Sequence, residues 1–270
     1  MALPNTGEIS ISQIRDEFEQ TGESALSDFY DLVRGLPANG EIRTSDFYSA
    51  EGPIIEDSFK GVEFFTTDSS SITVPIHSST DSTDTVIISA MFENDSTSRP
   101  SLSGFSILGS RNGFFIETSA TVITWIGSTS LSSISFNSNG LGGAAVISAT
   151  FKDNIVAENW QFDYAQGGGS DGLGPSIRSV NVSTDQHELY LFLAHRDGGN
   201  QQYQSWPLDS DLVNQVEYTD PQGAIPGRAA AFGWLPPSRS NVDVTLTDTE
   251  PKIFRNSGWY AYFTIRRPSV

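Results

Sequence analysis

The stretch Gly143-Ala144-Ala145-Val146-Ile147-Ser148-Ala149-Thr150-Phe151 decides the fold class, because its first part is almost entirely apolar. A second run of this kind covers Leu189–Ala194. Strands that are buried on both faces have continuous apolar runs, whereas strands with one face in water alternate apolar and polar residues. We therefore expect both runs to be central strands of β-sheets.

Shorter alternating segments surround these two runs, and turn signals such as Arg111-Asn112-Gly113 and Asn137-Ser138-Asn139-Gly140 separate them. No helical pattern lies between them, which predicts a mainly β protein with an antiparallel, jelly-roll-like β-sandwich rather than a parallel α/β sheet. The expected strands cover residues 71–76, 84–92, 104–108, 113–117, 120–127, 132–137, 143–151, 160–164, 176–182, 187–194, 229–234, 241–247 and 258–266.

Two longer stretches interrupt this pattern and are predicted to be loops, namely Gln166–Pro175 and Gly198–Arg228. Long loops in compact domains are often functional. The second stretch contains Tyr203 and Trp206, which could stack against a glycan or could instead cap the end of the sandwich core. We name these two aromatic residues as candidate glycan-binding residues.

The first 52 residues form a different kind of segment, in which one phrase occurs three times. Each copy has Gly-Glu, three residues and a serine, starting at Gly7, Gly22 and Gly40. Serine caps helices by accepting a hydrogen bond from an unpaired main-chain N–H, and Ser10 with Gln13 fits a capping box. The phrases predict short helices at 12–20, 27–34 and 45–48. We divide the chain into a module at 1–52 and a β-sandwich domain at 53–270.

The apolar residues of this module are too few to form a core of their own, and isolated helices of this length are marginal in water. We expect the module to dock, either on its own β domain or on a neighbouring subunit. The residues predicted to dock are Ile9, Ile11, Ile14, Phe18, Leu26, Phe29, Tyr30, Phe47 and Tyr48.

Composition excludes several classes of function. The chain carries 33 acidic and 15 basic Lys and Arg residues, a net charge of −18, which argues against nucleic acid or an anionic membrane as partner. Cysteine is absent, which excludes disulfides, thiol catalysis and Cys-ligated zinc. The sequence has neither a long apolar segment nor a signal-peptide pattern, so we expect no membrane insertion.

Catalytic motifs are weak. His187 and His195 would lie about 27 Å apart along a strand, too far to share an ion, and His77 is distant in sequence. Gly168–Gly172 matches G-x-S-x-G but lacks the strand-to-helix context that this motif requires. We expect no catalytic residue, cofactor or His-based metal site, although loop carboxylates leave calcium open. A glycosidase pair among the acids stays an alternative, with candidates at Glu158, Asp163, Asp171, Glu188, Asp197 and Glu217.

The N-terminal phrases resemble a short module of structural proteins from tailed bacteriophages, including tail fibre and other appendage proteins. The matching phrases are Ile9-Ser10-Ile11-Ser12-Gln13-Ile14, Leu26-Ser27-Asp28-Phe29-Tyr30 and Ser45-Asp46-Phe47-Tyr48, in the order found in that family. This chain departs from the pattern in having Ser-Ile-Ser for Ser-Leu-Ser and an inserted Asp31-Leu32-Val33-Arg34. The strand around Ile72–Pro75 and the segment Pro100–Leu108 resemble tail-protein β-sandwiches more loosely.

The resemblance implies a non-enzymatic virion protein that is assembled in the host cytoplasm. It would be a tail appendage, such as a fibre or tail-tip protein, that docks through residues 1–52 and displays its sandwich for host attachment. The implied partners are other virion proteins, further copies of the chain (a trimer among the options) and a host-surface glycan. A capsid decoration or cement protein is the alternative position, and a carbohydrate-active enzyme the alternative class.

Overall fold

The structure, a computed structural model, describes residues 10–17, 47, 58–94, 96–115, 118–152, 154–166, 177–182, 188–197, 212–219, 229–235, 242–247 and 257–267. These residues form one short helix, α1 (Ile11–Glu17), and antiparallel β-strands. The strands are β1 (Phe59–Thr67), β2 (Ser71–Pro75), β3 (Thr85–Phe92), β4 (Phe105–Phe115), β5 (Thr118–Gly127), β6 (Ser133–Asn137), β7 (Ala144–Phe151), β8 (Val156–Gln166), β9 (Ile177–Val182), β10 (Leu189–Asp197), β11 (Val213–Thr219), β12 (Ala229–Leu235), β13 (Val242–Thr247) and β14 (Ser257–Arg266). The predicted class, mainly β with packed antiparallel sheets, is confirmed.

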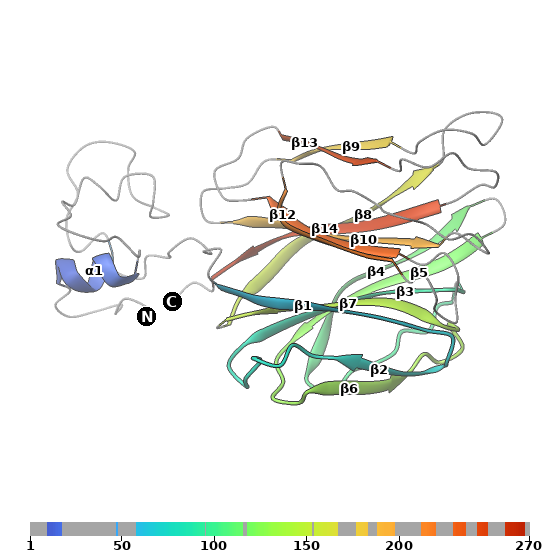
Figure 1. Ribbon diagram of the computed structural model, residues 1–270, viewed down its shortest axis with the longest axis horizontal. Helices are drawn as coiled ribbons and strands as arrows, with labels where there is room; N and C mark the ends of the chain where they lie inside the picture. The colour runs from blue at the N-terminus through green and yellow to red at the C-terminus, as the bar shows by residue number, and fades with distance from the viewer. Residues whose placement is uncertain are drawn as a thin grey trace.

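The strands form four layers (Figure 1). Two five-stranded sheets lie in the middle, with the orders β1-β7-β3-β5-β4 and β8-β14-β10-β12-β11. A two-stranded sheet covers the outer side of each, β2–β6 on one side and β9–β13 on the other. β7 and β10 are interior strands of their sheets, as the apolar runs at residues 143–151 and 189–194 predict.

The second half of the body repeats the connectivity of the first. Adding seven to each strand number turns β1-β7-β3-β5-β4 into β8-β14-β10-β12-β11, and turns β2–β6 into β9–β13. Every strand pairing in one half therefore has its counterpart in the other, and all are antiparallel. The predicted β domain at 53–270 thus contains two seven-stranded units, one in residues 59–151 and one in residues 156–266.

Each unit has a jelly-roll feature. β1 pairs with β7, and their chain neighbours β2 and β6 pair with each other in the outer layer. A two-stranded antiparallel ribbon is therefore folded across both layers, which is how jelly rolls enclose a core. β8 with β14 and β9 with β13 repeat this arrangement in the second unit.

The inner sheet of the first unit serves two cores at once. β3 is buried along its whole length, and its residues point alternately to opposite faces. Ile88 and Phe92 belong to the core that lies under β2–β6, together with Trp125 and Phe136. Ile87, one residue away, belongs to the core between the two units. β7 divides in the same way.

Large aromatic side chains hold the two units face to face. Phe59 of β1 stacks on Phe232 of β12 with ring centres 5.3 Å apart, and meets Trp234 edge-on at 4.8 Å. Between the units, β4 lies against β8, β7 against β12, β3 against β10 and β5 against β14. Aromatic contacts of this kind stabilise beyond the area that they bury.

A tryptophan forms a second contact between the units. The Trp160 ring on β8 lies directly over Gly109 of β4, where a Cβ atom would come within 2.1 Å of the ring. Its indole N–H donates to the Thr124 hydroxyl at 3.0 Å, and that hydroxyl donates to Ser89 Oγ at 3.3 Å. Trp160 is therefore an internal packing residue and is not exposed as a stacking platform for a ligand.

Three strand predictions were wrong. β1 was missed. The sequence predicts separate strands at 104–108 and 113–117, but residues 105–108 and 113–115 belong to one strand, β4. Arg111-Asn112-Gly113 pairs with β5 instead of turning, and Asn112 Oδ1 accepts from Arg99 at 2.8 Å. Val213–Thr219 lies in the predicted loop Gly198–Arg228, yet it forms the edge strand β11. An edge strand needs little apolar sequence, so its pattern is weak.

Gly109→Ala should destabilise the packing of the two units, because the added methyl group overlaps the Trp160 ring. Overpacking of this kind costs about 1–3 kcal/mol. Chemical denaturation should show the loss, and the double variant Gly109→Ala with Trp160→Leu should lose less stability than the sum of the two single variants, because the smaller side chain makes room for the methyl group. Equal stability of Gly109→Ala and the parent would contradict the packing described here.

Candidate functional site

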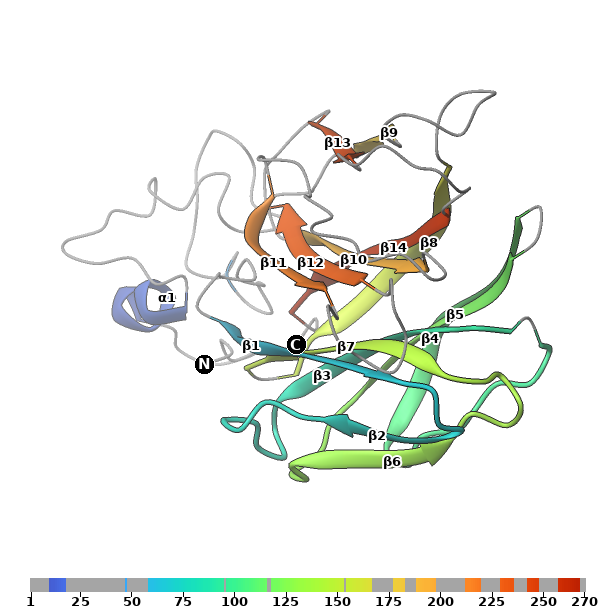
Figure 2. The ribbon, with the colours of Figure 1, turned by 45° about the vertical axis from the view of Figure 1, so that its right-hand side comes forward.

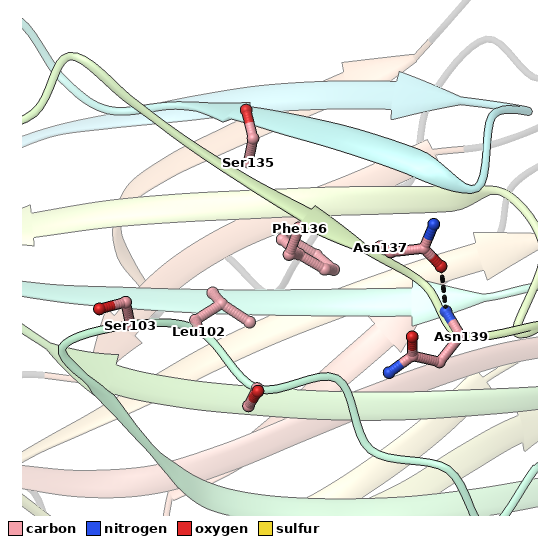
Figure 3. Close-up of a pocket in the computed structure, with 7 residues that line it drawn as sticks. Leu102, Ser103, Ser135, Phe136, Asn137 and Asn139 are labelled. Atoms are coloured by element: carbon pink, nitrogen blue, oxygen red, sulfur yellow. Dashed lines mark hydrogen bonds between the residues drawn. The ribbon is translucent and has the colours of Figure 1, made fainter.

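A groove of about 500 Å³ lies beside β6 on the outer layer of the first unit. One wall is the segment that precedes β4, and the other is β6 with the turn that follows it (Figure 3). The lining residues are Ser101, Leu102, Ser103, Ser135, Phe136, Asn137 and Asn139. Concave sites of this size are the usual places where small ligands bind.

The groove runs along the edge of β6 that faces away from β2. Ile76 N–H donates to Ser132 O, and Ser138 N–H donates to Ser70 O, so the even-numbered residues of β6 bond to β2. The alternation of an antiparallel ladder then directs the N–H and C=O groups of Ser133, Ser135 and Asn137 away from β2. Within the described residues no strand pairs with that edge.

Several side chains on the walls also keep hydrogen-bonding capacity. Ser135 shares a hydrogen bond with Thr73 at 2.8 Å, and Asn137 Oδ1 accepts from the Asn139 main chain at 2.8 Å (Figure 3). The side chains of Ser101, Ser103 and Asn139 make no hydrogen bond to the described part of the chain. Asn139 has φ of 55°, a left-handed conformation that asparagine tolerates.

The floor of the groove is apolar but narrow. Leu102 and Phe136 are 4% and 9% exposed, because both belong to the core under β2–β6. None of the seven lining residues is titratable, so the groove itself provides no general acid or base. Its walls are uncharged, although the chain as a whole carries −18.

The second notable cluster is an ion-pair network that joins β1 to the connection between β2 and β3. Lys60 Nζ lies 2.5 Å from Asp84 Oδ2 and 3.2 Å from Asp81 Oδ2, and it donates to Ser79 O at 3.1 Å. Asp84 is 1% exposed, and its Oδ1 atom is buried without a hydrogen-bond partner. Lys60 is the cation that makes burial of this carboxylate tolerable, so we assign the cluster a structural role.

Two members of this network, Asp81 and Lys60, have shifted pKa values. The hydroxyl and N–H of Thr83, followed by Lys60, lower the pKa of Asp81 to about 2, because all three stabilise the carboxylate. The hydrogen bond to Asp84 raises the pKa of Lys60 above 10.5, against an opposing effect of burial. Both shifts favour the charged forms, which keeps the cluster an ion pair at neutral pH.

Three of the predicted docking residues are described. Ile11 lies on α1 and is 46% exposed, whereas Ile14 and Phe47 are fully buried. The expected capping box is confirmed: Gln13 N–H donates to Ser10 Oγ at 3.2 Å, and Ser10 N–H donates to Gln13 Oε1 at 2.8 Å. The helix begins at Ile11, one residue before the predicted start, and residues 18–20 of the predicted range lie outside the described residues. The other predicted docking residues lie outside the described ranges, namely Ile9, Phe18, Leu26, Phe29, Tyr30 and Tyr48.

The candidate glycan-binding residues Tyr203 and Trp206 also lie outside the described residues, as do His187 and Asp171. Among the acids of the glycosidase alternative, Glu158 is paired with Arg266 at 2.9 Å. None of those acids lines the groove. Within the described ranges no group of three His, Asp or Glu residues is placed to hold a metal ion, and no helix has the length and apolar character to cross a membrane.

The groove residues were not predicted from the sequence. The one available signal is a charge-free stretch, since residues 118–151 contain no Asp, Glu, Lys, Arg or His in an otherwise acidic chain. That stretch supplies β6 and the turn after it, which form one wall of the groove. Serine and asparagine in such a stretch are usual on any solvated strand, so the pattern alone does not indicate a site.

Comparison of the chain with protein-family models, with curated proteins and with solved structures gives no significant match.

Thr83→Ala should raise the pKa of Asp81 from about 2 toward 3.8, because it removes the hydrogen bond with the largest effect on that carboxylate. A group whose pKa is lowered by folding stabilises the folded state above its ordinary pKa. In the parent protein this contribution should therefore be lost as the pH falls from about 4 to about 2, a loss that is smaller in the variant.

The pKa can be measured by NMR titration of the side-chain carboxyl signal, with Ser82→Ala as the control, since Ser82 is an exposed neighbour in the same turn. A parent pKa near 3.8 would show that Thr83 and Lys60 do not hold the carboxylate as described.

Proposed function

We propose that this chain is a structural component of a tailed-bacteriophage particle, specifically a tail appendage that docks through residues 1–52 and displays its β body. The observation that carries the proposal is the ordered set of three Gly-Glu/Ser phrases in that segment. In the first phrase the predicted capping box between Ser10 and Gln13 is present, whereas the serine that recurs in the three phrases, Ser12, lies inside α1 and does not cap it.

The β body supports a displayed, non-enzymatic role. Its two units share one core, so the body is a rigid block with a two-stranded layer on each outer side (Figures 1 and 2). Both views place α1 beside this block, away from the β2–β6 layer. The outer layers can therefore contact a host surface while residues 1–52, the leader, contact the particle.

The docking step follows from the side chains of α1. Ile11 is exposed on a helix whose neighbouring apolar residue, Ile14, is buried within the chain itself. Covering Ile11 with a partner would remove an apolar side chain from water, which is favourable. Residues 1–52 carry ten Asp and Glu residues against three Arg, and this net negative charge would steer the segment toward a more basic partner.

The decisive experiment compares incorporation of the full chain and of a chain without residues 1–52 into particles assembled in the host. We expect incorporation to be lost on deletion, and immunogold labelling of particles with the full chain to mark the tail. Gold over the head would support the decoration alternative, and undiminished incorporation of the truncated chain would contradict docking through the leader.

A single substitution tests the same point without deleting anything. Ile11→Glu should reduce incorporation at least tenfold while leaving the thermal unfolding of the protein unchanged, because Ile11 is exposed. Ser12→Glu is the matched control: it adds the same charge at the next exposed position of α1 without removing an apolar side chain. Equal loss with both variants would mean that charge, and not the apolar contact, is responsible.

A further inference from the structure

We infer that the groove beside β6 is a binding site for an uncharged saccharide chain. The inference deepens the display role proposed above and rests on it, since it names the ligand that one outer layer of the β body would take. The lining of the groove alone supports it, because Tyr203 and Trp206 lie outside the described residues.

The first reason is the distribution of hydrogen-bonding groups. Ser101 and Ser103 stand on one wall, and Asn137 and Asn139 on the other. The free edge of β6 adds main-chain N–H and C=O groups between them. Hydroxyl, amide and main-chain groups are both donors and acceptors, and a sugar hydroxyl is both as well. A ligand with hydroxyl groups on all sides uses this arrangement fully.

The second reason is charge. None of the lining residues is ionisable, and no cation lines the groove to neutralise a carboxylate, sulfate or phosphate. The net charge of −18 disfavours the approach of any anion. The ligand that fits these walls is therefore neutral, which separates neutral glycans from uronic-acid or sulfated ones.

The third reason separates a saccharide from a polypeptide strand, which could also pair with the free edge. Strand addition needs pockets for alternate side chains, yet the floor offers only Leu102 and Phe136, and both are already buried in the core. A bound strand would also pair its main chain with β6 alone, which leaves the Ser101 and Ser103 hydroxyl groups on the facing wall outside that ladder. The polar walls and the covered floor favour the saccharide.

The size of the groove sets the length of the ligand. A volume of about 500 Å³ is at the lower end of ordinary ligand sites, which suits two or three sugar rings rather than a long polymer segment.

The test is binding of the full-length protein to an array of neutral and anionic oligosaccharides, followed by titration calorimetry on the best neutral trisaccharide or longer ligand. We expect at least one neutral ligand to bind and the anionic ones to be rejected. Ser103→Ala with Asn137→Ala should weaken binding by about tenfold or more, since it removes two of the side chains that can hydrogen-bond the ligand. Ser130→Ala, at an exposed serine that does not line the groove, should change nothing.

Absence of any neutral binder, preference for anionic ligands, or equal binding by the groove variant would each overturn the inference. A peptide array distinguishes the strand alternative: peptide binding lost in Ser135→Pro but kept in Asn137→Ala would assign the groove to strand addition. Unfolding curves of all variants identify any loss that is due to misfolding. The groove variant should still enter particles, so failure of the saccharide test and failure of docking through the leader are separate results.

Discussion

Burial of β3 and β7 on both faces is the constraint on which the rest of this structure depends. An eight-residue strand without an exposed face needs apolar layers above and below it, and one sandwich provides only one of them. The β2–β6 layer covers Ile88 and Val146, and the second unit covers Ile87 and Ile147. Separating the units would expose the whole inter-unit core to water, far more than soluble surfaces usually expose. The two units of duplicated connectivity therefore form a single folded body and not two independent domains.

The sequence allowed the strands to be predicted but not their grouping into two units. Continuous apolar runs identified the interior strands β7 and β10, because burial on both faces leaves a clear mark on composition. β11 was missed because an edge strand requires little apolar sequence, and the false turn at Asn112 arose because a side-chain contact with Arg99, distant along the chain, holds that residue in the ladder. The repeat was missed because it preserves strand order and not residue identity, and strand order depends on long-range pairing.

The groove illustrates a similar limit for site prediction. Its walls come from residues 101–103 and 135–139, which are brought together only because β6 pairs with β2 and leaves its other edge open. Serine and asparagine have no fixed spacing that would indicate a binding site, unlike metal ligands or catalytic dyads. The order of elements along the chain relates the two candidate sites. In sequence, Tyr203 and Trp206 fall between β10 and β11, just as residues 93–104 fall between β3 and β4 of the first unit. The aromatic residues and the groove wall thus occupy corresponding connections of the two units.

Docking and display place conflicting requirements on a single surface, and in this proposal the leader meets the first and the groove meets the second. A docking surface gains affinity from apolar area that is removed from water, whereas a displayed surface must stay soluble and free of large apolar patches. Within the described residues, Ile14 and Phe47 are covered by the chain, and the large apolar side chains left exposed are Ile11 on α1, Ile107 on β4 and Leu131 ahead of β6. Of these three, Ile11 is the one in the segment proposed to dock. The outer β2–β6 layer carries serine and threonine instead, with no charged residue on β2 or β6. Because the two surfaces share no residue, a substitution in one leaves the other intact, and their roles can be measured independently.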